Sequence, residues 1–161
     1  MTARSEITVT INQPIEKVAQ AYSTREYWEF IAEKLSPEPG ELHEFADNTA
    51  TLFEILPKSI LPEAAQAMVS QDLKLKRVVN VGALEGDKHT MTGDVKGTPV
   101  DLGAEYTATR DGDNTTLNYE LEAKVNIPFM GAAIEPKVAD ALEEIVENEA
   151  KLTEQWISEN L

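Results

Sequence analysis

The sequence predicts an α+β fold in which a curved antiparallel sheet packs against a long C-terminal helix. Two stretches near the C-terminus carry this prediction. Over residues 116–127 apolar side chains occupy every second position, which is the period of a half-buried strand. After Pro128 and Gly131 the period becomes helical, and an apolar stripe runs from Ile134 to Trp156. A strand and a helix that are each apolar on one face must bury that apolar face. We therefore expect the two to pack on each other.

The N-terminal part of the chain predicts one strand and two helices. Residues 5–11 alternate between polar and apolar side chains, as a strand does. Pro14 suits the first position of a helix, because the N–H that proline lacks has no partner there. Thr24 is the expected cap of a second, short helix over residues 25–35, which carries the densest aromatic patch of the chain.

Six further strands are expected before the long helix. Their ranges are 41–46, 49–56, 73–84, 88–96, 100–109 and 116–127, separated by turn-forming residues such as Asp47-Asn48 and 111–114. The connection from Pro57 to Asp72 is too long for a hairpin turn. Residues 62–69 within it predict a short helix, which either plugs the end of the core or forms a lid over a binding site.

Composition limits the class of protein. A length of 161 residues with 42% hydrophobic and 27% charged residues predicts a single domain over residues 1–161. The chain contains no apolar run long enough to span a membrane, and its first residues lack the apolar core of a secretory signal. We therefore expect a cytoplasmic protein. The absence of cysteine excludes disulfides and thiolate metal sites.

The net charge of −15 narrows the range of partners. Such a chain repels phosphate backbones and anionic lipid, so neither nucleic acid nor an anionic membrane surface is expected to bind. Much of the acidity lies in residues 135–161. Two interpretations stay open for this acidic helix: a solvated outer face, which we favour, or a docking surface for a basic protein partner.

The order of one strand, two helices, six strands and one long helix resembles the START-like, helix-grip superfamily (SRPBCC). This superfamily includes pollen-allergen-like proteins, polyketide cyclases and lipid-transfer domains. Residues 127–135, Ile-Pro-Phe-Met-Gly-Ala-Ala-Ile-Glu, are similar to the strand-to-helix junction of an uncharacterised actinobacterial branch. Asn12 and residues 14–18, Pro-Ile-Glu-Lys-Val, look like the superfamily's first strand-to-helix passage. Pro136 departs from the pattern, so the last helix either begins there or kinks there.

The resemblance implies about seven antiparallel strands curled around the C-terminal helix, with a cavity between them for apolar or amphipathic small molecules. The interior positions of these elements are then the candidate ligand-binding residues. They are Met68, Tyr106, Tyr119, Ile134, Val138, Leu142, Ile145, Glu149 and Trp156. A solid core of the same residues is the alternative. The ligand is expected to enter near residues 57–72.

Polar residues in the apolar stripes allow two interpretations each. Glu149 lies between Ile145 and Leu152 on the helix, where it either orients a ligand from the interior or reaches water after a slight rotation, and we favour water. The sequence places Lys74, Lys76 and Arg77 in one basic cluster, which we assign to the solvent face of a strand.

Catalytic chemistry has little support in the sequence. No nucleophile elbow, zinc-binding motif, phosphate loop or dinucleotide fingerprint is present. His43 and His89 have no second histidine at helical spacing, so both are expected at the surface or a strand edge, and no metal or cofactor is expected.

Three functional classes remain. The first, which we favour, is a binding or carrier protein for a hydrophobic small molecule. The second is a cyclase, dehydratase or hydrolase that uses cavity tyrosines and a carboxylate. The third is an interaction protein with a filled core and an acidic surface.

Overall fold

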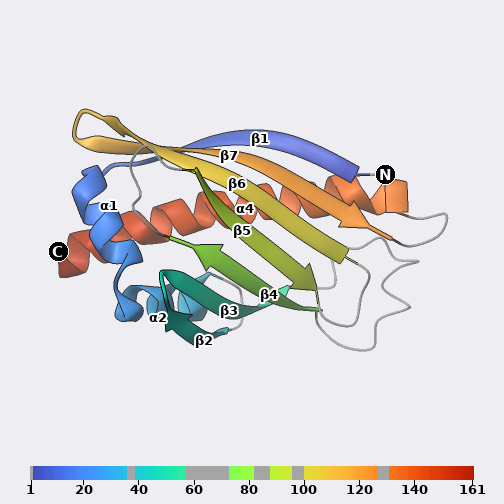
Figure 1. Ribbon diagram of the computed structural model, residues 1–161, viewed down its shortest axis with the longest axis horizontal. Helices are drawn as coiled ribbons and strands as arrows, with labels where there is room; N and C mark the ends of the chain where they lie inside the picture. The colour runs from blue at the N-terminus through green and yellow to red at the C-terminus, as the bar shows by residue number, and fades with distance from the viewer. Residues whose placement is uncertain (1, 36–38, 57–72, 82–87, 96–99, 127–130) are drawn as a thin grey trace.

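Seven strands and three helices form the described part of the protein, and the sheet curves around one long helix (Figure 1). The structure is a computed structural model and describes residues 2–35, 39–56, 73–81, 88–95, 100–126 and 131–161. The strands are β1 (Thr2–Ile11), β2 (Glu41–Ala46), β3 (Thr49–Leu56), β4 (Leu73–Asn80), β5 (Lys88–Val95), β6 (Val100–Asp111) and β7 (Asn114–Val125). The helices are α1 (Ile15–Tyr22), α2 (Arg25–Lys34) and α4 (Gly131–Asn160).

The sheet is antiparallel throughout and has the order β1-β7-β6-β5-β4-β3-β2. Each of the strands β2 to β7 pairs with its neighbour in the sequence, and β1 joins the sheet beside β7. Asp47 and Asn48 both adopt positive φ, of 53° and 58°, as the two-residue hairpin turn between β2 and β3 requires. These observations confirm the predicted α+β, helix-grip architecture with its curved sheet and long C-terminal helix.

Alternation in β7 places one face of the sheet against α4. Tyr119, Leu121 and Ala123 are buried, whereas the side chains at positions 118, 120, 122 and 124 are exposed. This outcome confirms the predicted two-residue period. The two short helices α1 and α2 pack near the C-terminal end of α4 (Figure 1).

The helix starts differ in detail from the sequence predictions. Pro14 is the residue before α1 rather than its first residue, and its backbone is extended. Thr24 precedes α2 as expected, but its hydroxyl donates to the Gln20 carbonyl, 2.7 Å away, and makes no cap hydrogen bond. The Thr24 hydroxyl therefore satisfies a carbonyl of the preceding helical turn.

Pro136 lies inside α4, because the helix begins at Gly131. The alternative in which the helix starts at Pro136 is therefore wrong. The neighbouring Glu135 is buried, and its Oε2 accepts a hydrogen bond from the Val125 N–H at 3.1 Å. This contact ties the end of β7 to the first turns of α4.

The short helix expected over residues 62–69 lies outside the described residues. Within the described ranges, no helix combines the length and apolar character needed to cross a membrane.

Two glycines provide a matched test of the packing. A Cβ at Gly40 would lie 2.3 Å from the Phe53 carbonyl oxygen and 2.9 Å from that of Ala32, whereas one at Gly103 meets no atom within 4 Å. Because backbone atoms cannot move aside cheaply, we expect Gly40→Ala to cost about 1–3 kcal/mol of unfolding free energy. Gly103→Ala is expected to be neutral or to stabilise by up to about 1 kcal/mol. Urea denaturation measures both, and equal effects would contradict the described position of residue 40.

Candidate functional site

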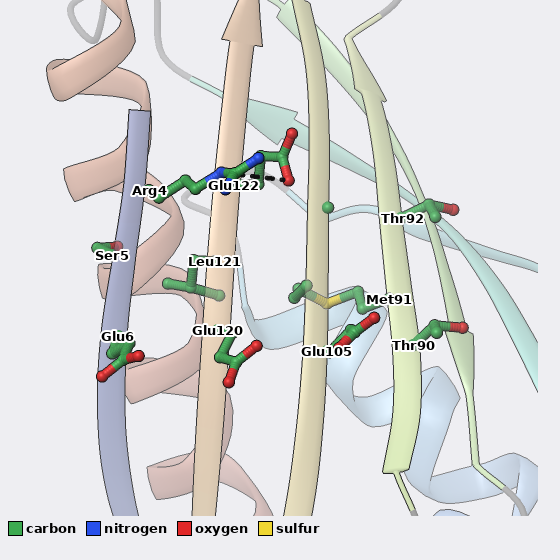
Figure 2. Close-up of a pocket in the computed structure, with 12 residues that line it drawn as sticks. Arg4, Ser5, Glu6, Thr90, Met91, Thr92, Glu105, Glu120, Leu121 and Glu122 are labelled. Atoms are coloured by element: carbon green, nitrogen blue, oxygen red, sulfur yellow. Dashed lines mark ion pairs between the residues drawn. The ribbon is translucent and has the colours of Figure 1, made fainter. Parts of the chain in front are cut away.

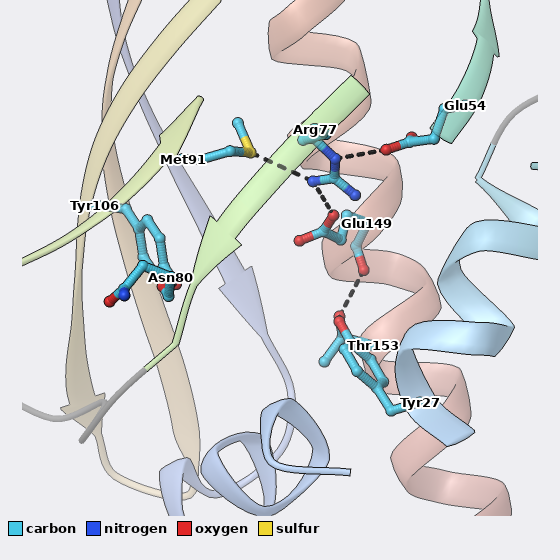
Figure 3. Close-up of polar contacts among 8 residues, drawn as sticks. All are labelled: Tyr27, Glu54, Arg77, Asn80, Met91, Tyr106, Glu149 and Thr153. Atoms are coloured by element: carbon cyan, nitrogen blue, oxygen red, sulfur yellow. Dashed lines mark hydrogen bonds and ion pairs between the residues drawn. The ribbon is translucent and has the colours of Figure 1, made fainter. Parts of the chain in front are cut away.

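Three charged side chains meet in the interior between the sheet and α4 (Figure 3). They are Arg77 of β4, Glu54 of β3 and Glu149 of α4, and each is at most 4% exposed. Arg77 Nε donates to Glu54 Oε1 at 2.6 Å. Arg77 Nη1 forms a second ion pair with Glu149 Oε2 and also lies 3.4 Å from the Met91 sulfur. We call these three residues the buried ion cluster.

Strand register explains how the cluster forms. Leu52 of β3 pairs with Arg77, and Glu54 pairs with Leu75, so Glu54 lies diagonally across from Arg77 on the same inward face. On the other side of β4, the residue opposite Arg77 is Gly93. Gly93 has no side chain, and a Cβ there would crowd Leu75 and Leu102. The inward face of α4 supplies Glu149 from the opposite side.

The position of Arg77 contradicts its assignment to a solvent face. Arg77 is two residues from both Leu75 and Val79 along β4, so its side chain points to the same buried face as theirs. The neighbouring Lys74 and Lys76 made the segment look uniformly basic. Glu149 is also buried, which contradicts the interpretation that it reaches water. The ion pair with Arg77 is the reason, because it compensates the carboxylate for its lost hydration.

Two further corrections concern His89 and Glu54. His89 is only 5% exposed and packs against the Tyr106 ring, so it is not a surface residue, whereas His43 is exposed as expected. Sequence reasoning missed Glu54 entirely. The available signal was that Glu54 falls on the same alternate positions of β3 as Ala50 and Leu52, and so on the buried face. A carboxylate buried there needs a cation as its partner.

The buried ion cluster carries one positive and two negative formal charges, and so one negative charge in excess. Burial lowers the pKa of Arg77, but the nearby carboxylates outweigh burial and raise that pKa above its usual value. Burial raises the pKa of Glu54; Arg77 opposes this shift, and Glu149 adds to it. Arg77 therefore stays charged, and Glu54 holds a proton more readily than an exposed glutamate does.

One nitrogen of the cluster lacks a partner. Arg77 Nη2 is buried and makes no hydrogen bond within the part of the chain that the structure describes. A buried donor without an acceptor costs roughly 1–3 kcal/mol, so it calls for an explanation. Arg77 borders a narrow gap in the packing that is too small to hold a water molecule. The gap is lined by Leu75, Arg77, Met91, Thr92, Gly93, Leu102, Gly103 and Leu142.

Tyr106 and Tyr119 lie opposite each other on β6 and β7, and their rings stack at 5.3 Å. Tyr106 donates its hydroxyl proton to the Asn80 carbonyl at 2.6 Å. Burial raises the pKa of both tyrosines, and the negative charge of Glu149 raises each pKa further. Both hydroxyls therefore stay protonated and act as hydrogen-bond donors.

A third tyrosine is connected to the cluster through α4 (Figure 3). The Thr153 hydroxyl donates to the Glu149 carbonyl oxygen at 2.7 Å and lies 2.6 Å from the Tyr27 hydroxyl. Because a threonine hydroxyl has one proton, Tyr27 must be the donor to Thr153. This chain of bonds fixes the α4 turn that carries Glu149 against α2.

The other candidate ligand-binding residues lie on the inward faces as well. Ile134, Val138, Leu142 and Trp156 of α4 are buried, and Ile145 is partly buried. Met68 and the expected entry at residues 57–72 lie outside the described residues. The structure thus brings the α4 residues and the two tyrosines to one interior, and whether a ligand contacts them stays a prediction.

A separate hollow of about 910 Å³ lies on the outer face of the sheet, across β1, β7, β6 and β5 (Figure 2). Its central row consists of Glu6, Glu120 and Glu105, which are direct partners across neighbouring strands. Arg4 pairs with Glu122 one row away, and Lys88 pairs with Glu105. Within the described ranges, no group of His, Cys, Asp or Glu side chains is arranged to hold a metal ion. This outer face is acidic and open to water.

Comparisons with known proteins agree with this architecture. Residues 6–157 match the model of the family described as "Protein of unknown function (DUF2505)", so the chain belongs to that family. A search of curated proteins finds no match.

Solved structures with similar folds cover nearly the whole chain. A protein from Thermus thermophilus has a TM-score of 0.65 at 12% identity, with 98% of each chain covered. The Zhui aromatase/cyclase from a Streptomyces species has a TM-score of 0.57 at 12% identity, covering 98% of this chain and 92% of its own. A START superfamily protein from Mycobacterium smegmatis has a TM-score of 0.57 at 14% identity, covering 98% and 99%. These likenesses confirm the START-like fold.

Removal of the guanidinium is expected to destabilise the protein strongly. Arg77→Met leaves Glu54 and Glu149 buried without their cation, and we expect a loss of about 3–5 kcal/mol. The triple variant Arg77→Met, Glu54→Gln, Glu149→Gln is expected to recover most of that loss, because it removes all three charges together. Arg25→Met is the control, since Arg25 pairs with Glu29 at the surface, and it should change stability by less than about 0.5 kcal/mol. A loss below about 1 kcal/mol for Arg77→Met in urea denaturation would contradict the cluster.

The raised pKa of Glu54 also predicts a pH dependence. Between the unfolded value of 4.5 and the raised folded value, the folded protein holds a proton that the unfolded chain does not. Glu54 therefore lowers the free energy of unfolding as pH rises through this window. We expect the stability of the wild type relative to Glu54→Gln to fall from pH 4.5 upward and then level off. Glu120→Gln, on the outer face, controls for the loss of one negative charge, and a wild-type advantage that grows with pH would contradict the assignment.

Proposed function

We propose that the protein binds an apolar or amphipathic small molecule in its interior, between the sheet and α4, and acts as a binding or carrier protein. The observation that carries this proposal is Arg77 Nη2, which has no acceptor among the described residues and lies in an interior that is otherwise mostly apolar. Ligand sites are typically apolar with a few convergent polar groups that fix orientation. A core that serves packing alone has no use for a buried donor without an acceptor.

The proposed wall consists of the residues that the sequence singled out on facing elements. Leu142 borders the narrow gap at Arg77. Tyr106 and Tyr119 are buried with protonated hydroxyls, and Tyr106 donates its proton to the Asn80 carbonyl. Met91 also borders the gap, and its flexible side chain can move to admit a ligand. The likeness to a START superfamily protein supports the proposal at the level of the fold.

An enzymatic function is the second candidate, and Glu54 is the observation that favours it. A buried carboxyl group with a raised pKa keeps its proton to higher pH than an exposed glutamate does and can donate it, and a protonated tyrosine such as Tyr119 can stabilise a developing oxyanion. The Zhui aromatase/cyclase has the same fold. If this function holds, Glu54→Gln abolishes turnover of a bound ligand and leaves its binding intact.

The binding proposal is tested by filling the interior. Leu142 is 1% exposed, and Leu142→Trp places an indole in the gap beside Arg77. We expect uptake of an environment-sensitive apolar dye to fall at least about fivefold, because the added ring overfills the gap that the dye must open. Fluorescence titration measures the uptake, and circular dichroism verifies that the variant is folded.

Glu144→Trp is the control, because Glu144 is exposed on the same helix and its substitution adds the same ring outside the interior. Dye uptake should be unchanged in this variant. If the wild type takes up no dye, and protein purified from its own host carries no small molecule in native mass spectrometry, the binding proposal fails. In that case the acidic outer surface becomes the leading functional candidate.

A further inference from the structure

We propose that the polar end of the ligand is neutral, a hydroxyl or carbonyl group whose oxygen accepts a hydrogen bond from Arg77 Nη2. This inference rests on the proposed function and assigns the chemical class of its ligand. It favours amphipathic alcohols and ketones over fatty acids and over amines. Hydrogen bonding and charge each support the assignment.

The first argument is hydrogen bonding. A guanidinium nitrogen is a donor only, so whatever completes the site must bring an acceptor. Within the described ranges, Nη2 is the one nitrogen of Arg77 without a partner, because Nε bonds to Glu54 and Nη1 pairs with Glu149. An ammonium group offers donors only, so it would leave Nη2 unsatisfied and place two cations side by side. An amine is therefore a poor fit despite the negative charge of the cluster.

The second argument is charge. Among the described residues, Arg77 is the one buried lysine or arginine, and Glu54 and Glu149 already pair with it. A ligand carboxylate would be a third anion on one cation and would raise the formal charge of the group from −1 to −2. In a poorly solvated interior that repulsion is large. A neutral oxygen satisfies the donor without this cost.

The packing around Arg77 gives the ligand apolar surroundings. Arg77 borders a narrow gap that also reaches Gly93 and Leu142, and apart from Arg77 and Thr92 its walls come from apolar residues or glycine. The gap is too small for a water molecule, so a ligand enters only when flexible side chains such as Met91 move aside. A Cβ at Gly93 would lie 3.1 Å from side-chain atoms of Leu75 and Leu102, so a larger residue there would crowd this gap further. A polar head at Arg77 therefore has apolar surroundings for its hydrocarbon part.

The test uses three probes with one tail: 1-octanol, octanoate and octylamine, titrated into the wild-type protein at pH 7.5 by displacement of an apolar dye. We expect octanol to bind at least about tenfold more tightly than octanoate or octylamine. Equal or tighter binding of octanoate or octylamine overturns the inference and leaves the binding function standing. If none of the three binds and the dye itself is not taken up, the proposed function fails as well.

Variants then assign the selectivity to the buried ion cluster. Glu54→Gln removes the excess negative charge and leaves an acceptor for Arg77 Nε, so octanoate should bind about three- to tenfold more tightly while octanol binding stays nearly constant. Glu120→Gln makes the same charge change on the outer face and should alter neither affinity. An unchanged ratio in Glu54→Gln would show that the cluster does not set selectivity.

A measurement on the wild type covers the case in which Glu54→Gln does not fold. In protein labelled with ¹⁵N-arginine, octanol should shift the Nη resonances of the buried guanidinium, and octanoate at the same concentration should not. Shifts from octanoate alone, or from neither probe while octanol displaces the dye, overturn the inference.

Discussion

The buried ion cluster is the interaction on which the interior depends. Arg77 connects β3, β4 and α4 through two carboxylates that lie 95 positions apart in the sequence, at 54 and 149. Buried charges tolerate little displacement, because each must keep its partner within hydrogen-bond distance. The cluster therefore fixes the rotation of α4 about its axis and the register of β3 on β4. An apolar core of the same volume would allow several nearly equivalent packings.

The same cluster explains why the interior has a polar centre at all. Four tyrosines, Tyr22, Tyr27, Tyr106 and Tyr119, lie near Glu149, and burial together with its charge keeps their hydroxyls protonated. Each protonated hydroxyl is a donor, and Tyr27 and Tyr106 already donate to Thr153 and to the Asn80 carbonyl. Among the described residues, Arg77 Nη2 is a buried donor without an acceptor. That donor is the one that a ligand acceptor can use.

Sequence reasoning predicted the architecture well and the site only in part. Periodicity identified the strands and α4, because alternation reports directly which face of a strand is buried. It also placed Tyr106 and Tyr119 together. Sequence reasoning failed at Arg77 and Glu149. Their charge suggested exposure to water, whereas the strand alternation at Arg77 and the helical spacing at Glu149 suggested the interior. Glu54 was missed for the same reason. A charged residue on a buried face is explained only by a partner on another element, and the register of that partner appears only in the fold.

The position of β1 has a consequence for synthesis of the chain. β1 is the first strand made, yet its partner β7 is the last, and the Thr8 hydroxyl bonds to Asn118 across 110 positions. During translation β1 therefore stays without its sheet neighbour until most of the protein has left the ribosome. α4 covers the sheet later still. Such distant pairing slows folding and leaves strand edges open to other chains until β7 is made.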